Sequence, residues 1–342
     1  MPHEEIAPIK SRFIASTLHP CAGRATSSAS SIVIHERSAS PVRSESAVPE
    51  KRQHVPQSPP MLKTLEGGVR VLHYIPPSNV TPKGLVVILP GDRSMPMGPG
   101  APAEVKPKSA IFSSSATTIF SVLARRLAEE GYCVSHFAWR AIPANANLRT
   151  PQRVRECADD VLASTTSLRL AHDRSSANGA PLPLVLVAHS SEGCAAAMAA
   201  ACLSLSGAKG RDLGPLAGIV ACSSGLRVDD GRFHYGGCDT MSCLSTFGRF
   251  GMPLMLMHGL EDTTVEAEAT ALIYESARGP KACCLLRGCD HTMATRFDDA
   301  LSVLLMWVPG LHKRYGVLGD SRGQLRCVEA DRELGLNTSV LL

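Results

Sequence analysis

The sequence has few aromatic residues and little net charge. Aromatic residues make up 4% of the 342 residues, so aliphatic side chains and alanine must fill any hydrophobic core. The formal net charge is +4, and no dense run of lysine and arginine interleaved with aromatic residues is present. Proteins that bind nucleic acids usually carry such a basic surface. We therefore expect no nucleic-acid partner.

Long apolar runs are also missing. No run approaches the roughly 18 to 20 residues that a membrane-spanning helix needs, and the first residues lack the continuous apolar segment of a secretory signal. We therefore predict a soluble protein without a transmembrane segment. An arginine- and serine-rich stretch between residues 11 and 44 leaves mitochondrial import as the alternative to a cytoplasmic location.

The twelve cysteines form no C-x-x-C pair and show no repeated spacing. Several lie inside apolar runs, which is typical of reduced, buried thiols in an intracellular protein. The densest group contains Cys283, Cys284, Cys289 and His291. Neighbouring residues on a strand point to opposite faces, so Cys283 and Cys284 are poorly placed to share an ion. We predict no metal site and no cofactor.

Composition divides the chain into three parts. Residues 1–60 are rich in serine, proline and arginine and have few clustered hydrophobic residues, which predicts disorder. Residues 61–310 carry the regular pattern of a folded domain. Residues 311–342 form a C-terminal extension in which we find no clear signal.

Within the central part, apolar strands alternate with helical patterns. Strands that are apolar throughout and alternate with helices are typical of an α/β protein with an open, mostly parallel sheet covered by helices on both faces. Ligands of such a sheet bind at the carboxyl ends of its strands. The predicted strands span 69–77, 84–92, 132–137, 182–188, 216–224, 253–259 and 282–288, and the predicted helices span 117–131, 150–171, 194–206, 266–277 and 295–308.

Polar residues follow one of these strands abruptly. The stretch LPLVLVAHSSEG places Ser190 and Ser191 between a buried strand and an alanine-rich helix. A serine there lies on a tight turn, and the helix N-terminus beyond it offers unpaired N–H groups that favour an oxyanion. This setting is typical of a nucleophile elbow.

From about Met61 to Val308 the chain resembles the α/β-hydrolase fold family, whose elbow reads G-x-S-x-G. In the favoured register Ser190 takes the nucleophile position, with Ala188 and Glu192 in place of the two glycines. A register shifted by one residue makes Ser191 the nucleophile and uses Gly193 as the second glycine.

The resemblance also implies an acid and a base. The family keeps its acid after a strand followed by H-G-x-x-D, which here places it at Asp262, with the neighbouring Glu261 as the lesser candidate. It keeps its base in the loop before the last helix, where this chain has His291. The oxyanion hole is then expected from the backbone N–H groups of Ser191 and Asp92.

The function that the resemblance implies is a serine hydrolase that cleaves an ester, thioester or small amide of a small-molecule acyl substrate through an acyl-enzyme, in the manner of a carboxylesterase or lipase. Two alternatives remain open: an acyltransferase with the same triad, and a binding protein without turnover, suggested by Glu192 and Asp92 near the site. Residues 225–251 are long enough for a short lid. The pattern does not indicate an oligomeric state.

Overall fold

The computed structural model describes residues 60–65, 68–77, 79–89, 91, 115–139, 151–171, 180–225, 227–229, 232–235, 238–318 and 340–341. The disorder predicted for the N-terminal segment lies outside these ranges, as does most of the C-terminal extension. None of the helices in the described ranges is both long enough and apolar enough to cross a membrane.

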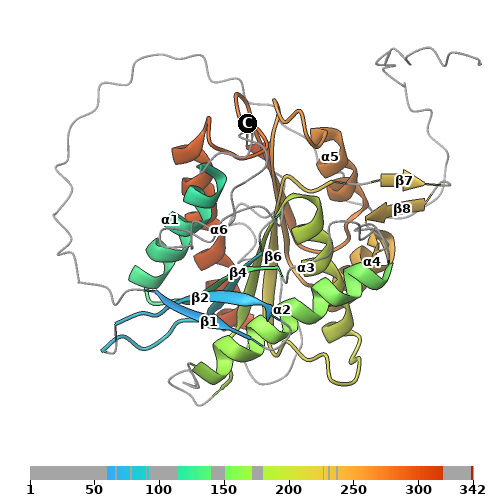
Figure 1. Ribbon diagram of the computed structural model, residues 1–342. Coiled ribbons are helices and arrows are strands. Elements are labelled where there is room, and N and C mark those ends of the chain that lie inside the picture. Colours follow the sequence, from blue (N-terminus) through green and yellow to red (C-terminus); the bar gives the residue numbers. More distant parts are fainter. Residues whose placement is uncertain are drawn as a thin grey trace, which may run out of the picture. The chain divides into compact units, whose positions relative to one another are not determined.

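A nine-stranded sheet forms the centre of the fold, in the order β1-β2-β4-β3-β5-β6-β10-β11-β12 (Figure 1). Only β2 is antiparallel to its neighbours, and the other adjacent strands pair in parallel. The predicted open, mostly parallel sheet is therefore confirmed. The strands are β1 (Met61–Thr64), β2 (Arg70–Tyr74), β3 (Leu85–Leu89), β4 (Cys133–Ala138), β5 (Leu184–His189), β6 (Leu216–Cys222), β10 (Leu254–Gly259), β11 (Lys281–Leu286) and β12 (Val340–Leu341).

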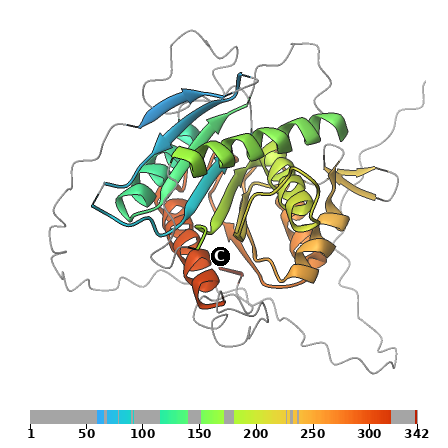
Figure 2. The same cartoon turned by 90° about the horizontal axis from the view of Figure 1, so that it is seen from below.

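Helices cover both faces of the sheet, as predicted, because its central strands are apolar on both sides. In β3, for example, Val86 and Ile88 pack on one face while Leu85, Val87 and Leu89 pack on the other. The first face is covered by α1 (Ser115–Glu129) and α6 (Phe297–Leu318), and the second by α2 (Pro151–Ala171), α3 (Ser190–Leu205), α4 (Thr240–Phe250) and α5 (Ala267–Ser276). Figures 1 and 2 show α1 and α6 on the side of the sheet opposite to α2 and α3.

Helix α3 is buried on all sides. Nine consecutive residues from Gly193 to Ala201 are buried, and most of them are alanine. Because these side chains are small, α2 and α4 pack closely against α3, while the sheet covers its inner face. The first residue of this helix is Ser190.

The last helix is longer than the sequence pattern indicates. We predicted an end at residue 308, but α6 continues through Pro309 to Leu318, so the expected domain boundary at residue 310 falls inside the helix. Burial explains the continuation, because Val308 and Leu311 lie in the core on either side of the proline. Part of the expected C-terminal extension therefore packs on the sheet.

Residues 225–251, where we predicted a short lid, contain a separate three-stranded antiparallel sheet and α4. Its strands are β7 (Arg227–Asp229), β8 (Arg232–Tyr235) and β9 (Cys238–Asp239). In α4, Cys243, Leu244 and Phe247 are buried in the core cluster that includes α3. This end of the segment thus belongs to the core, and a lid role for the remainder stays a prediction.

Candidate active site

Three of the predicted site residues meet at the carboxyl ends of β5, β10 and β11. Ser190 follows β5, Asp262 lies in the turn after β10, and His291 lies in the loop between β11 and α6. The distance from Ser190 Oγ to His291 Nε2 is 3.0 Å, and His291 Nδ1 lies 2.7 Å from Asp262 Oδ2. One imidazole therefore bridges the hydroxyl and the carboxylate.

The turn at Ser190 is strained. Ser190 has φ 57°, a left-handed conformation that non-glycine residues rarely adopt. The preceding residue, His189, is still extended, so the chain changes from strand to helix within one residue. Gly91, after β3, lies so close that a Cβ added to it would be 2.2 Å from Ser190 Cβ. Ser190 is thus held half-buried at a sharp bend, with the backbone of Gly91 packed against it.

The alternative nucleophile, Ser191, lies in the first turn of α3. The hydroxyl that contacts His291 is that of Ser190, the residue with the strained backbone. The N–H of Ser191 is among the first four of the helix, which have no partner within the helix. It is therefore available to a ligand at the helix N-terminus.

The carboxylate of Asp262 accepts four hydrogen bonds. Oδ1 accepts from the backbone N–H groups of Thr264 (2.8 Å) and Val265 (2.9 Å). Oδ2 lies 2.7 Å from His291 Nδ1 and 3.1 Å from His258 Nε2. Burial alone raises the pKa of this carboxyl, but the hydrogen bonds from His258, His291 and Val265 outweigh burial and hold the pKa well below its usual range. Asp262 is therefore ionised at neutral pH.

The ionised carboxylate fixes the tautomer of His291. Nδ1 carries the proton that is donated to Asp262, so Nε2 of the neutral ring can accept the hydroxyl proton of Ser190. This is the arrangement that general-base activation of a serine requires.

The backbone of His291 is also held in place. Its carbonyl oxygen accepts hydrogen bonds from His189 Nε2 (2.9 Å) and from Ser223 Oγ (3.3 Å). The His189 ring packs on Phe120, with ring centroids 5.2 Å apart. Burial, with the nearby His291 as the next cause, lowers the pKa of His189 to about 4. His189 is therefore neutral at pH 7 and supports the loop of His291 from beneath the elbow.

Glu261, the lesser candidate for the acid, has other partners. Its Oε2 accepts the backbone N–H groups of Gly288 (2.5 Å) and Cys289 (3.1 Å). His258, in contrast, is fully buried beside Asp262, and its Nδ1 lies 2.6 Å from Thr270 Oγ1. The position of His258 at the end of its strand suggests a structural neighbour of the acid turn, whereas the bonds of Glu261 to residues 27 and 28 positions away have no signal in the sequence.

Asp92 and Glu192 are the two residues that suggested a crowded site, and the structure describes only Glu192. Asp92, the expected second oxyanion donor, lies outside the described residues. Glu192 is half-buried, and its Oε1 accepts a hydrogen bond from Cys157 Sγ on α2 at 3.7 Å. The carboxylate of Glu192 therefore reaches towards α2.

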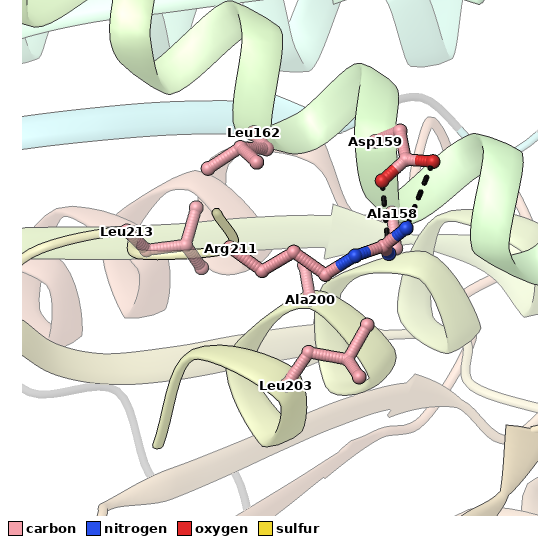
Figure 3. Close-up of a pocket in the computed structure, with 7 residues that line it drawn as sticks. All are labelled: Ala158, Asp159, Leu162, Ala200, Leu203, Arg211 and Leu213. Carbon is pink, nitrogen blue, oxygen red and sulfur yellow. Dashed lines mark hydrogen bonds and ion pairs between the residues drawn. The ribbon is translucent and has the colours of Figure 1, made fainter. Parts of the chain in front are cut away.

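Two hollows in the described part of the chain lie on other surfaces. Between α2, α3 and the segment with Arg211 and Leu213 there is a cavity of about 10 Å³, which is room for about one water molecule. Figure 3 shows Arg211 extended towards Asp159, with which it forms an ion pair at 2.9 Å. A wider hollow of about 580 Å³ lies between β1 and α2. Neither is lined by Ser190 or by the residues bonded to it.

The described residues contain no group of three or more histidine, cysteine, aspartate or glutamate side chains suited to a metal ion. Burial raises the pKa of Cys283, Cys284 and Cys289 to about 12, so these thiols are protonated at neutral pH.

No protein-family model and no curated protein matches the sequence. Among solved structures, the chain is similar to the esterase domain of a Rhodothermus marinus protein, with 18% identity, coverage of 74% of this chain and 97% of the other, and a TM-score of 0.45. Est1E from Butyrivibrio proteoclasticus gives 12% identity, 74% and 99% coverage, and a TM-score of 0.48. A putative α/β hydrolase from Agrobacterium tumefaciens gives 11% identity, 77% and 98% coverage, and a TM-score of 0.49.

The fold is assigned from the sheet and the order of elements in this chain. The mostly parallel sheet is covered on both faces, and a strained serine lies between β5 and α3. An acid follows β10 and a histidine follows β11, so the chain order is serine, acid, histidine. This arrangement of sheet, helices and site residues is the α/β-hydrolase fold.

Proposed function

We propose that the protein is a serine hydrolase of the esterase type, which cleaves an acyl bond in a small-molecule substrate through an acyl-enzyme. Ser190 is the nucleophile, His291 the base and Asp262 the acid that orients it. The observation that carries the proposal is the continuous hydrogen-bonded path from Ser190 Oγ through both ring nitrogens of His291 to Asp262 Oδ2.

In the first half of the reaction, Ser190 Oγ attacks the carbonyl carbon of the substrate while its proton passes to His291 Nε2. The carbonyl oxygen becomes an oxyanion, and the imidazolium is stabilised by the ionised Asp262. When the tetrahedral intermediate collapses, His291 gives the proton to the departing alcohol, thiol or amine. The acyl group remains as an ester on Ser190.

In the second half, water replaces the leaving group. His291 Nε2 takes a proton from water as the water oxygen attacks the acyl-ester carbon, and it returns that proton to Ser190 Oγ as the acid product departs. The atoms balance without an external reductant, oxidant or cofactor. This chemistry fits an ester, a thioester or a small amide.

The oxyanion needs two donors. One is the N–H of Ser191 at the N-terminus of α3, where the helix dipole also favours negative charge. The second is proposed to be the N–H of Asp92, next to Gly91, which already packs against the elbow. A donor of this kind contributes on the order of 10²- to 10³-fold to the rate.

A fluorophosphonate probe tests the proposal, because it modifies only an activated serine. We expect the full-length protein to be labelled, Ser190→Ala to abolish labelling and lower kcat on an ester by on the order of 10⁶-fold, and Ser191→Ala to keep labelling because its backbone N–H remains. Ser191→Ala is thus the matched control.

Two results would contradict the proposal. Loss of labelling only in Ser191→Ala would move the nucleophile by one residue. A folded wild-type protein that is not labelled would favour binding without turnover. Product analysis with an alcohol or amine present then separates hydrolysis from acyl transfer, and a series of p-nitrophenyl esters of increasing chain length defines the acyl group.

A further inference from the structure

The turn that carries Asp262 and the loop that carries His291 are joined directly. Parallel pairing of β10 with β11 ends at Gly259 and Leu286. Beyond the strands, Leu260 N donates to Leu286 O at 2.9 Å and Glu261 N donates to Cys289 O at 3.1 Å. The ladder therefore continues from the sheet into both loops.

The side chain of Glu261 strengthens this junction. Its Oε2 accepts hydrogen bonds from the N–H groups of Gly288 and Cys289, at 2.5 and 3.1 Å. With the bond from its own N–H to Cys289 O, Glu261 makes three hydrogen bonds to two consecutive residues of the base loop. Glu261 thus supplies three of the hydrogen bonds that join the two loops.

The backbones of the two loops also touch. A Cβ added to Gly259 would lie 2.2 Å from Cys289 O and 2.6 Å from Cys289 C. Cys289 itself is fully buried. The acid turn and the start of the base loop are therefore in contact without side chains between them, and a change in one backbone is transmitted to the other.

Further hydrogen bonds close the base loop beyond this contact. Asp290 Oδ1 accepts the N–H of Ala294 at 3.0 Å, and Asp290 N donates to Thr295 Oγ1 at 3.1 Å. His291 lies between the residues that these bonds join, so the loop backbone determines where its ring is placed. The position of the ring relative to Asp262 then depends on how the start of the loop is attached to the acid turn.

We infer that Glu261 is a positioning residue for the reaction: it attaches the base loop to the acid turn and thereby sets the separation of 2.7 Å between His291 Nδ1 and Asp262 Oδ2. The inference rests on the proposed function of Ser190, Asp262 and His291. A misplacement of about 1 Å in a catalytic group can cost on the order of 10²-fold in rate, so a loosened attachment has a measurable effect.

Three variants of the full chain test this role. Glu261→Ala removes the acceptor, Glu261→Gln keeps an amide oxygen that can accept both N–H groups, and Glu268→Ala removes an exposed acid in the first turn of α5 as a control. We expect Glu261→Ala to slow fluorophosphonate labelling and to lower kcat on a p-nitrophenyl ester about tenfold, with KM within about twofold of wild type. Glu261→Gln and Glu268→Ala should remain within about twofold of wild type in both kcat and KM.

A structural contribution to folding alone would change the thermal midpoint and leave kcat of the folded protein intact. Wild-type kcat in folded Glu261→Ala would therefore overturn the inference. An equal loss in Glu261→Gln and Glu261→Ala would overturn it as well, because the amide should preserve the attachment.

The low-field proton resonance of His291 Nδ1–H, assigned by its loss in His291→Gln, separates this inference from the proposed function. The resonance reports the contact between His291 and Asp262 whether or not the enzyme turns over. If the wild type is not labelled, the proposed function fails, but weakening of the resonance in Glu261→Ala and its persistence in Glu261→Gln still support positioning. An unchanged resonance in Glu261→Ala overturns it.

Discussion

Two buried histidines at opposite ends of the sheet differ in their partners. His258, at the carboxyl end of β10, has hydrogen-bond partners for both ring nitrogens, in Thr270 Oγ1 at 2.6 Å and Val265 O at 3.0 Å, and it also reaches Asp262. His312 in α6 lies beside Gly84, before β3, and neither of its ring nitrogens makes a hydrogen bond of standard geometry, the Leu85 backbone being a weak neighbour. Burial of an imidazole is therefore not by itself a sign of function in this fold.

His258 and His312 differ in the interactions that offset the cost of burying a polar ring. At the carboxyl end of the sheet, polar groups form a connected network around Asp262, which stabilises charge where the proposed reaction needs it. At the other end, His312 packs against the Tyr132 ring with centroids 4.9 Å apart. Burial lowers the pKa of His312 to about 3, against the opposing effect of the Leu85 backbone. His312 therefore behaves as a neutral packing residue.

The largest expected effect tests whether the network at the carboxyl end carries the reaction. Asp262→Asn keeps the shape of the side chain but removes the charge and favours the wrong tautomer of His291, so we expect kcat to fall on the order of 10⁴-fold. Ester hydrolysis and fluorophosphonate labelling measure it. Asp159→Asn, which alters only the ion pair with Arg211, is the control and should stay within about twofold. A fall in kcat of less than about tenfold in Asp262→Asn would show that the polar network around Asp262 does not carry the reaction. The two ends of the sheet would then not differ in function.

The next effect concerns stability in acid. Burial lowers the pKa of His136 and His189 to about 4 and that of His312 to about 3, from an ordinary value of 6.5. As the pH falls from about 6.5 to 4, the unfolded chain binds protons that the folded chain does not. The free energy of unfolding should thus fall by about 1.4 kcal/mol per pH unit for each histidine.

Urea unfolding at pH 7 and pH 5 measures this loss, and His312→Leu sharpens the comparison. Because the variant removes one of the three neutral histidines, we expect its stability to depend on pH about one third less than that of wild type. An identical dependence in the variant and the wild type would show that His312 does not contribute, contrary to its position without a hydrogen bond of standard geometry.

The smallest expected effect concerns the cavity of Figure 3. Arg211→Ala breaks a partly exposed ion pair with Asp159, and such pairs contribute about 0.2 to 1 kcal/mol to stability. We expect a loss of this size in thermal or urea unfolding and no change in kcat. A fall in kcat of more than about tenfold would couple this region to the site and contradict the separation between them.

The sequence predicted the parts of the fold that have a local signal. Uninterrupted apolar runs marked the central strands, and the abrupt change from strand to serine marked the position of the elbow. The exposed edge strand β1 has no such pattern because an edge strand needs no apolar run, and the strands β7–β9 are too short to show one. The continuation of α6 through Pro309 depends on burial of residues on both sides of it, which local rules do not include.

The candidate site was predictable to a similar degree. The chain order of serine, acid and histidine pointed to Ser190, Asp262 and His291, but their support was not visible. The bond from His189 to the carbonyl of His291 joins residues 102 positions apart, and that from Gly288 to Glu261 joins residues 27 apart. The H-G-x-x-D spacing favoured Asp262 over its neighbour Glu261, and the folded chain adds that Asp262 is buried while Glu261 is exposed.

The alanine-rich helix α3 has a consequence for how this protein can vary. Between Gly193 and Ala201 every position is buried and most side chains are a single methyl group, so nearly any replacement adds volume where none is available. In a library that samples all substitutions, this stretch should accept the fewest, while the exposed side of α2 accepts many. The proposed nucleophile thus lies three residues before a stretch in which few substitutions fit.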